Sequence, residues 1–198
     1  DSSVLISFAL AEEEVGKASG NYFEYKGKTF ILTAAHVAVA SRATDGVQLV
    51  VKERFGIEKS LAKPVYVDEA TDIAILVLER ELTTVEPQKW LRKDHWDIDI
   101  GDEVYYTGHP MDMNYMSFKG SISKIYSDLI MLQSWAYMGS SGAAIFDQRG
   151  RVVGVVSAIK YDIHAVPQML PSLVLVAPLT YLNNQLLYEI LNNDRSED

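Results

Sequence analysis

The residues that could do chemistry centre on a short stretch rich in glycine and serine, Met138-Gly139-Ser140-Ser141-Gly142-Ala143-Ala144. Glycines two positions before and one position after Ser141 let the backbone bend sharply and approach a ligand closely. Such a turn can direct a hydroxyl and bare backbone N–H groups at one point. Acyl transfer needs this arrangement, because the hydroxyl attacks a carbonyl and the N–H groups stabilise the oxyanion. The same letters also occur in ordinary turns and linkers, so the stretch alone does not establish a site.

A serine nucleophile needs a base, and the base needs a carboxylate to orient it. His36 sits among small residues just after an apolar stretch that ends at Thr33. Asp72 stands at the head of Ile73–Leu78, the most hydrophobic stretch of the chain, where a carboxylate is costly to bury without a partner. Each residue alone could be structural, as a core histidine or an acidic strand-start residue. Their joint occurrence with Ser141 favours a Ser-His-Asp arrangement.

These candidates belong to an acidic chain without cysteine. Its 198 residues carry a formal net charge of −9, which disfavours binding to nucleic acid or to anionic lipid. The absence of cysteine excludes disulfides, zinc–thiolate sites and a thiol nucleophile. No group of metal ligands with suitable spacing is evident, so we expect neither a metal nor a cofactor.

The sequence does not assign a localisation. The longest clean apolar run, Ile73–Leu78, is far shorter than the ~20 residues of a membrane helix, so no membrane partner is expected. Residues 1–14 lack the basic lead-in of a secretory signal. Because the chain opens with Asp1 rather than Met, we expect that upstream residues were removed or are missing. The oligomeric state is left open.

The elements that must position these residues are mostly strands, because the hydrophobic pattern has a period of two. Gly27 marks a hairpin turn, and the stretch Thr83–Asp99 has no firm period and is the best candidate for a linker. Two helices are expected, a short one at His36–Ser41 and a longer one at Tyr181–Leu191 with Thr180 as its N-cap. Many short strands argue for an all-β barrel or sandwich. The strands expected are Val4–Leu10, Asn21–Tyr25, Thr29–Thr33, Val47–Glu53, Pro64–Asp68, Ile73–Leu78, Glu103–Gly108, Met116–Tyr126, Leu129–Gln133, Ala143–Asp147 and Val152–Ile159.

Three motifs together resemble those of the trypsin-like (chymotrypsin-fold) serine peptidases, and among them the compact HtrA-type bacterial and viral members without a PDZ domain. Phe30-Ile31-Leu32-Thr33-Ala34-Ala35-His36-Val37 is similar to the family's histidine motif. Asp72-Ile73-Ala74-Ile75-Leu76 is similar to its aspartate motif, and Gly139-Ser140-Ser141-Gly142-Ala143 to its serine motif. The motifs occur in the family's order, and the resemblance covers roughly residues 19–178.

The resemblance implies an all-β fold of two six-stranded antiparallel β-barrels with a C-terminal helix. Residues 1–85 would form the N-terminal barrel, which carries His36 and Asp72. Residues 86–100 would be a linker, and residues 101–198 would form the C-terminal barrel with Ser141 and the helix. The active site would lie in the cleft between the barrels.

The resemblance also implies roles for single residues. His36 would be the general base, Asp72 the residue that orients it, and Ser141 the nucleophile. The backbone N–H groups of Gly139 and Ser141 would form the oxyanion hole. Ser157 falls where the family has a serine that contacts the buried aspartate, so a hydrogen bond to Asp72 is expected. The implied activity is serine endopeptidase, with a protein or peptide as substrate.

Specificity follows less directly from the resemblance. In the family, the residue six positions before the nucleophile lies at the base of the pocket for the side chain preceding the cut (P1), and here it is Trp135. Ser157, Ala158 and Ile159 would form the pocket wall and pair with substrate backbone. No acid is present, so we expect a small or aliphatic P1 residue rather than Lys or Arg. Trp135 could instead be a core residue.

Several alternatives stay open. Ala143 replaces a glycine of the family pattern, which could tighten the turn, and Ser140 lies beside Ser141, which we take as the nucleophile. A catalytically silent domain that acts as a binding or assembly protein, for example in a virus particle, is the main alternative to an enzyme. An α/β-hydrolase esterase fits poorly, because that fold places its acid and histidine after the serine. Gly108-His109-Pro110 is expected to be a strand-end turn, and Met111, Met113 and Met116 an apolar loop near the cleft or ordinary packing.

Overall fold

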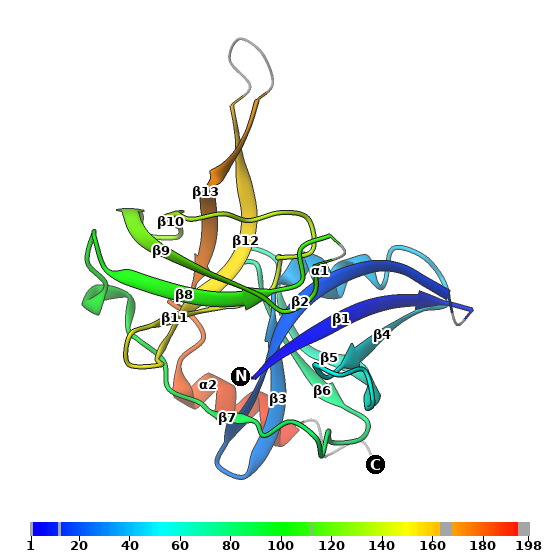
Figure 1. Cartoon of the computed structure of the whole chain (residues 1–198). Coiled ribbons are helices and arrows are strands. Elements are labelled where there is room, and N and C mark those ends of the chain that lie inside the picture. The colour runs from blue at the N-terminus through cyan, green and yellow to red at the C-terminus, as the bar shows by residue number, and fades with distance from the viewer. Residues whose placement is uncertain (1, 12, 112, 163–167, 194–198) are drawn as a thin grey trace.

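The computed structural model describes residues 2–11, 13–111, 113–162 and 168–193, and the side chains of these residues except 158–171. Its strands form two closed six-stranded antiparallel barrels, which lie side by side in Figure 1. The all-β prediction and the barrel prediction are therefore confirmed. One cluster of buried apolar side chains fills the first barrel and extends to Ala144, Val155 and Ala177 of the second, and another lies inside the second barrel.

The first barrel closes because its first strand pairs on both sides. Strand β1 pairs with β2 and with β4, and the order around the sheet is β1-β4-β5-β6-β3-β2. The turn between β2 and β3 is the hairpin that Gly27 predicts, with left-handed backbone at Lys26 (φ 51°) and Gly27 (φ 77°). The elements are β1 (Ser3–Leu10), β2 (Glu13–Tyr25), β3 (Lys28–Thr33), α1 (Ala35–Ala40), β4 (Val47–Lys52), β5 (Lys59–Asp68) and β6 (Ile73–Leu78).

The second barrel follows a connecting stretch that holds β7 (Gln88–Lys89) and a 3-10 turn at His95–Asp97. Its strands close in the order β10-β13-β12-β11-β8-β9. Strands β12 and β13 continue past the barrel and pair there only with each other, as the projecting hairpin in Figure 1 shows. The strands are β8 (Glu103–Gly108), β9 (Met116–Ile125), β10 (Ile130–Gln133), β11 (Ala144–Asp147), β12 (Val152–Asp162) and β13 (Gln168–Pro178).

The last described element, α2 (Asn184–Asn193), packs against the first barrel rather than the second. Leu187 and Leu191 of α2 are buried in the first barrel's apolar cluster. Trp90, which follows β7, lies between Phe23 and the helix. Its ring is 5.2 Å from that of Phe23, and its Nε1 donates to Asn184 Oδ1 at 3.0 Å. Strand β7 itself pairs in parallel with β2, so the connecting stretch is bound along the first barrel.

The expected N-cap of the C-terminal helix was wrong. The cap is Asn183, whose Oδ1 accepts a hydrogen bond from the backbone N–H of Leu186 at 2.8 Å. Thr180 Oγ1 is buried without a hydrogen-bond partner in the described part of the chain. Leu179 and Leu182 are both buried as the chain leaves β13, and the chain bends between them before the helix begins.

The sequence also missed two strands, the two-residue β7 in the expected linker and the long β13. Pro171 lies inside β13, and proline argues against a strand because it cannot donate to the ladder. The pairing of β12 with β13 shifts register at this point: Ile159 faces Val174, whereas Lys160 faces Leu170. Pro171 thus falls in an irregularity that tolerates the missing donor.

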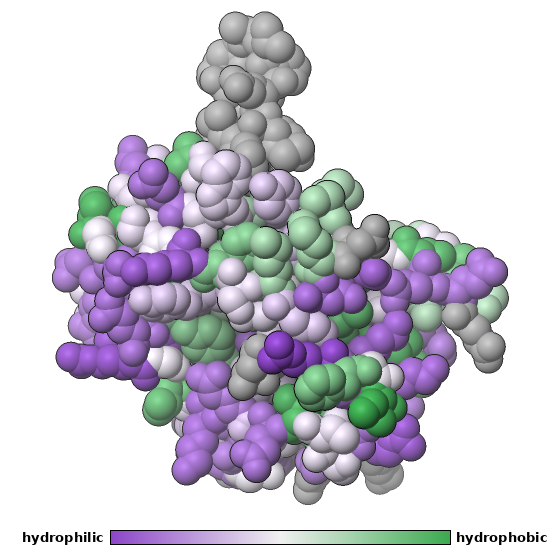
Figure 2. Space-filling view, viewed as in Figure 1, coloured by the Kyte–Doolittle hydropathy of each residue, from purple (hydrophilic) through white to green (hydrophobic). Residues whose placement is uncertain are grey.

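Within the described residues, no helix has the length and apolar character needed to cross a membrane. The face of the molecule in Figure 2 is mostly hydrophilic at its periphery, and hydrophobic residues gather where the end of β8 meets the first barrel.

Candidate active site

His36 and Asp72 meet at one corner of the first barrel. Strand β3 ends at Thr33, and β6 begins at Ile73 beside it, because the two strands are antiparallel neighbours with Thr33 opposite Ala74. His36 follows β3 on the first turn of α1, and Asp72 directly precedes β6. The backbone of Asp72 is left-handed, with φ 55°, which is uncommon for a residue with a side chain and often marks a functional position.

The contacts at this corner fix the orientation of the imidazole. His36 Nδ1 lies 3.0 Å from both carboxylate oxygens of Asp72, and the backbone N–H of His36 donates to Oδ1 at 2.9 Å. Because Nδ1 faces a carboxylate, it carries the proton, and Nε2 of the neutral ring is left as an acceptor. The side chain of His36 is 49% exposed, so the ring is accessible to a substrate.

Ser157 reaches the same carboxylate from the second barrel. Its hydroxyl donates to Asp72 Oδ2, so the structure contains the hydrogen bond that the resemblance implied. Burial alone would raise the pKa of Asp72, but hydrogen bonds from the His36 ring, the Ser157 hydroxyl and the His36 amide together lower this pKa below its usual value. Asp72 is therefore ionised at neutral pH and can stabilise a protonated imidazole.

Ser141 lies in a turn between β10 and β11 that is pressed against the first barrel. The Ser19 backbone N–H donates to the Ser141 carbonyl at 2.8 Å. A Cβ atom added to Gly142 would lie 2.1 Å from Ser19 O and 2.1 Å from Thr33 Oγ1, so only glycine fits there, and its φ is 90°. Thr33 is three residues before His36, so these contacts bring the serine turn close to the segment that carries His36.

Within the stretch Gly139–Ala143, two backbone N–H groups have no hydrogen-bond partner among the residues that the structure describes, those of Gly139 and Ser141. The other three N–H groups of this stretch are bonded: Ser140 N–H to Tyr137 O at 2.9 Å, Gly142 N–H to Val156 O at 2.8 Å, and Ala143 N–H to Ser140 O at 3.1 Å. Gly139 and Ser141 are both partly exposed, and neighbouring free N–H groups in a turn form a concavity that can bind an anion.

The two adjacent serines have different surroundings. Ser140 is 1% exposed, and its hydroxyl accepts a hydrogen bond from the Tyr137 N–H at 3.4 Å. Ser141 is partly exposed. In the described structure no hydrogen bond joins its hydroxyl to the His36 ring, and catalytic hydrogen bonds are often long until substrate binds. Ala143 is fully buried, so the methyl that replaces the family's glycine is accommodated.

Trp135 does not belong to a barrel core, because 53% of it is exposed. Its carbonyl accepts a hydrogen bond from the Tyr106 hydroxyl. The backbones of Ala158 and Ile159 continue β12 opposite Leu175 and Val174. The side chains of Ala158 and Ile159 lie outside the described residues.

Exposed methionines border the serine turn. Met138 is 80% exposed and Met111 52%, and the Met111 N–H donates to Met138 O at 2.8 Å. Met113 and Met116 are also exposed. These side chains are therefore not packed in a core. Flexible thioether side chains can contact apolar groups of varied shape.

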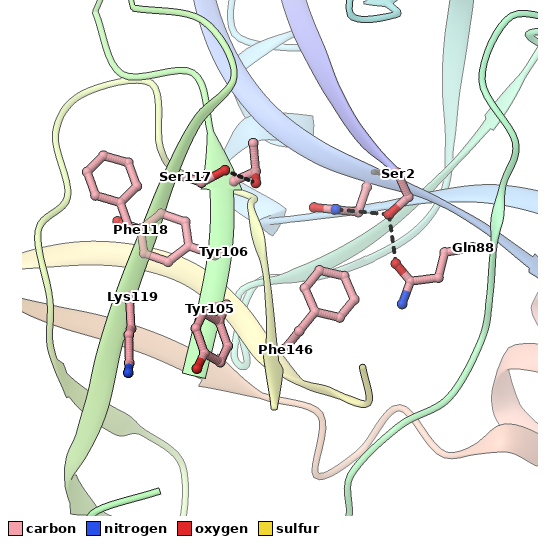
Figure 3. A pocket seen from close by; sticks show the side chains of 10 residues that line it. Ser2, Gln88, Tyr105, Tyr106, Ser117, Phe118, Lys119 and Phe146 are labelled. Carbon is pink, nitrogen blue, oxygen red and sulfur yellow. Dashed lines mark hydrogen bonds between the residues drawn. The ribbon is translucent and has the colours of Figure 1, made fainter. Parts of the chain in front are cut away.

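A pocket of about 440 Å³ lies at the seam of the barrels, and none of the predicted site residues lines it (Figure 3). Its walls include the rings of Tyr105, Phe118 and Phe146. Across it, Asn21 donates to Ser2 Oγ at 3.2 Å, and Ser2 donates to Gln88 Oε1 at 3.1 Å. Because Asn21 Oδ1 also accepts the Ala144 N–H at 2.9 Å, this network braces the strand that follows Ser141.

Sequence reasoning missed the residues that hold the serine turn. Ser19 accepts the His109 N–H at 3.0 Å and donates to Gly139 O at 2.7 Å. A Cβ at Gly139, whose φ is 98°, would lie 2.3 Å from His109 O. These contacts join the Ser19 side chain to the backbones of distant segments, so neither residue type nor spacing predicted them.

Comparison with known proteins decides the family. The sequence profile of the trypsin-like peptidase domain matches residues 18–155. The chain belongs to this family. A probable periplasmic serine endoprotease DegP-like of Bartonella henselae is 29% identical over 153 residues, which are 72% of this chain and 28% of that protein. The magnetosome formation protease MamE of Magnetospirillum gryphiswaldense is 27% identical over 140 residues, which are 66% of this chain and 17% of that protein.

The fold of the family is also present in a solved structure. The serine endoprotease from Yersinia pestis superposes with a TM-score of 0.72 at 22% identity, covering 98% of this chain and 64% of the other. The chain thus spans less than a third of each of the two curated relatives.

Proposed function

We propose that this member of the trypsin-like serine protease family is an active serine endopeptidase. The single observation that supports the proposal most is the corner at Asp72: the carboxylate holds Nδ1 of His36 so that Nε2 is free to act as a base. The unpaired N–H groups of Gly139 and Ser141 add a site where negative charge can develop.

In the proposed mechanism, His36 Nε2 takes the proton of Ser141 as the hydroxyl oxygen bonds to the scissile carbonyl carbon. The carbonyl oxygen becomes an oxyanion that the N–H groups of Gly139 and Ser141 stabilise. Collapse of this intermediate breaks the C–N bond, and His36 returns the proton to the leaving amine. Water then attacks the acyl-enzyme by the same steps and restores Ser141. Asp72 stabilises the imidazolium in both stages.

For specificity we propose a P1 pocket formed by Trp135, Ser157, Ala158 and Ile159, with a preference for small or aliphatic side chains. The exposed ring of Trp135 and the absence of an acidic residue among these four support it. Cleavage of a peptide library should then show few cuts after Lys or Arg.

We also propose the division of the chain into an N-terminal barrel (1–85), a linker (86–100) and a C-terminal barrel with helix (101–198). The two barrels support this division, because no strand of the described residues pairs across them. The parallel pairing of β7 with β2 and the packing of α2 on the first barrel imply that the N-terminal barrel is incomplete without the linker and the C-terminal helix.

Labelling with a fluorophosphonate tests the activity. The wild type and Ser140→Ala should be labelled at one site, whereas Ser141→Ala should not be labelled and should lose peptide hydrolysis by about 10⁴-fold or more. Loss of labelling in Ser140→Ala, with Ser141→Ala still labelled, would contradict the assignment of the nucleophile. A folded wild type that neither reacts nor cleaves would favour a binding or assembly protein.

A further inference from the structure

His109 is a fully buried histidine that the proposed catalytic steps do not use. It directly follows β8 and is 0% exposed. Its Nδ1 accepts the backbone N–H of Tyr115 at 3.2 Å, and its Nε2 lies 3.3 Å from Ser3 Oγ. Because Tyr115 donates to Nδ1, this nitrogen carries no proton, and the neutral ring has its proton on Nε2. The Ser3 hydroxyl in turn donates to Thr107 O at 3.1 Å, so the whole chain of hydrogen bonds is consistent.

The ring closes a strained loop between β8 and β9. Met111 (φ 49°) and Tyr115 (φ 60°) both have left-handed backbones, which side chains other than glycine adopt at a cost. The Tyr115 ring packs edge-on against that of His109, with centroids 4.3 Å apart. Tyr115 also donates its hydroxyl to Lys52 O at 3.2 Å. The loop therefore keeps its shape through His109 and Tyr115 together.

Of the two carbonyl groups that flank the Gly139 Cα atom, this loop holds one directly and the other through Ser19. Met138 O accepts the Met111 N–H at 2.8 Å. Gly139 O accepts from Ser19 Oγ at 2.7 Å, and the same hydroxyl accepts the His109 N–H at 3.0 Å. The peptide between Met138 and Gly139 is planar and trans, so its N–H points opposite to its carbonyl. Because the loop holds Met138 O, the Gly139 N–H points away from the loop, where it has no partner among the described residues.

We propose that His109 is a positioning residue for the oxyanion hole, because its buried ring shapes the loop that holds the Met138–Gly139 peptide in place. This inference rests on the proposed peptidase function. Without the ring, the loop would lose the acceptor for Tyr115, and Met111 would hold Met138 O less firmly. The peptide could then rotate and present a carbonyl where the oxyanion must form.

The electrostatics agree with a ring that stays neutral during catalysis. Burial lowers the pKa of His109 to about 4, with a hydrogen bond to the Val4 carbonyl opposing this shift and the charge of Lys17 adding to it. A protonated ring would also place an N–H against the N–H of Tyr115. At neutral pH His109 therefore remains an acceptor at Nδ1.

Three substitutions separate the two contacts of the ring. His109→Asn puts an amide oxygen near the place of Nδ1 and keeps an acceptor for Tyr115. His109→Gln puts an amide near the place of Nε2 and keeps only the contact with Ser3. His109→Phe fills the volume and keeps neither. All three are first compared with wild type by thermal unfolding.

Peptide hydrolysis is the first arm of the test. His109→Phe and His109→Gln should lower kcat by about 10²- to 10³-fold, the loss seen when one oxyanion donor is removed, with KM changed less than about twofold. His109→Asn should stay within about tenfold of wild type. If His109→Phe does not fold, the Asn and Gln variants carry the comparison. Equal activity of the two, or greater activity of His109→Gln, would overturn the proposal.

The second arm does not depend on activity. In a Ser141→Ala background, amide hydrogen exchange at Met111 reports its bond to Met138 O. Exchange at Met111 should accelerate in His109→Gln and remain near its starting rate in His109→Asn, with Val156 in β12 as an unchanged control. Wild type without activity but with this exchange pattern would refute the peptidase function and leave the loop contacts intact. Full activity and unchanged exchange in His109→Gln would refute the role of His109.

Discussion

On the first barrel, His36 is held by side chains: one carboxylate contacts its ring and its backbone N–H, and Ser157 contacts that carboxylate. On the second barrel, Ser141 is held through the backbone of its turn, whose carbonyl groups accept hydrogen bonds from Ser19 and from the loop that follows β8. The difference indicates which kind of substitution should impair each half of the site. The histidine corner should respond to changes of charge, and the serine turn to changes of backbone shape and of the residues packed beneath it.

The largest effect should come from removing the charge at the histidine corner. Asp72→Asn should lower kcat by about 10⁴-fold, because an amide can no longer fix the proton of His36 on Nδ1 or stabilise the imidazolium. Asparagine tolerates the left-handed backbone at this position, so the melting temperature should stay close to that of wild type. A purified variant with more than a tenth of wild-type kcat would contradict the role of Asp72.

The serine turn should instead fail by losing its fold. Gly142→Ala should lower the free energy of unfolding by roughly 3–5 kcal/mol, because its Cβ would overlap Ser19 O and Thr33 Oγ1 at a φ of 90°. Gly27→Ala is the matched control, since it has a φ of 77° with no atom within 4 Å and should cost only about 1–2 kcal/mol. Urea unfolding of both variants measures the difference, and equal losses would show that the close packing has no energetic weight.

Acid should weaken the support of the serine turn as well. His109 has a folded-state pKa of about 4, below the usual histidine value, so its contribution to stability is complete above about pH 6.5 and is lost as the pH falls toward 4. The loss reaches roughly 3 kcal/mol by pH 4. Urea unfolding between pH 7.5 and 4 should show it in wild type and much less of it in His109→Asn. Parallel pH curves for the two proteins would be inconsistent with this origin.

The smallest effect should come from the hydrogen bond that Ser157 of the second barrel donates to Asp72 of the first. Ser157→Ala removes a donor from Asp72 but leaves the contacts from His36, so kcat should fall by only about tenfold, equivalent to about 1.4 kcal/mol. Because this donor helps to lower the pKa of Asp72, the acid limit of stability should move to slightly higher pH. Activity equal to that of Asp72→Asn would mean that the bond between the barrels, rather than the carboxylate, dominates.

The sequence predicted the all-β fold and the approximate place of most strands, because alternation and hairpin glycines are local signals. That His36, Asp72 and Ser141 lie close together was predicted only from the resemblance of three motifs. Local sequence patterns carry no information on the distance between residues so far apart in the chain. The contact of His36 with Asp72 and that of Asp72 with Ser157 are present in the structure. The roles of these residues and of Gly139 in catalysis, and that of Trp135 in specificity, remain predictions.

What the sequence could not predict depends on tertiary context. His109 looked like an ordinary strand-end residue, because Ser3, Ser19 and Tyr115 meet it only once both barrels have formed. Asp72 gave no sign of its left-handed backbone, which follows from its place at the junction with β6. The cap at Asn183 depends on how the chain leaves β13, and Pro171 in β13 is tolerated only because the register shifts there.

The packing of α2 on the first barrel has a consequence for synthesis. Phe23 and Phe30 near the N-terminus share their apolar cluster with Leu187 and Leu191, which are made more than 150 residues later (187 − 30 = 157). During synthesis, part of the apolar surface of the barrel that carries His36 therefore stays exposed to water until α2 has been made and packs on it. A nascent chain that ends before α2 should bind chaperones and should not hydrolyse peptides.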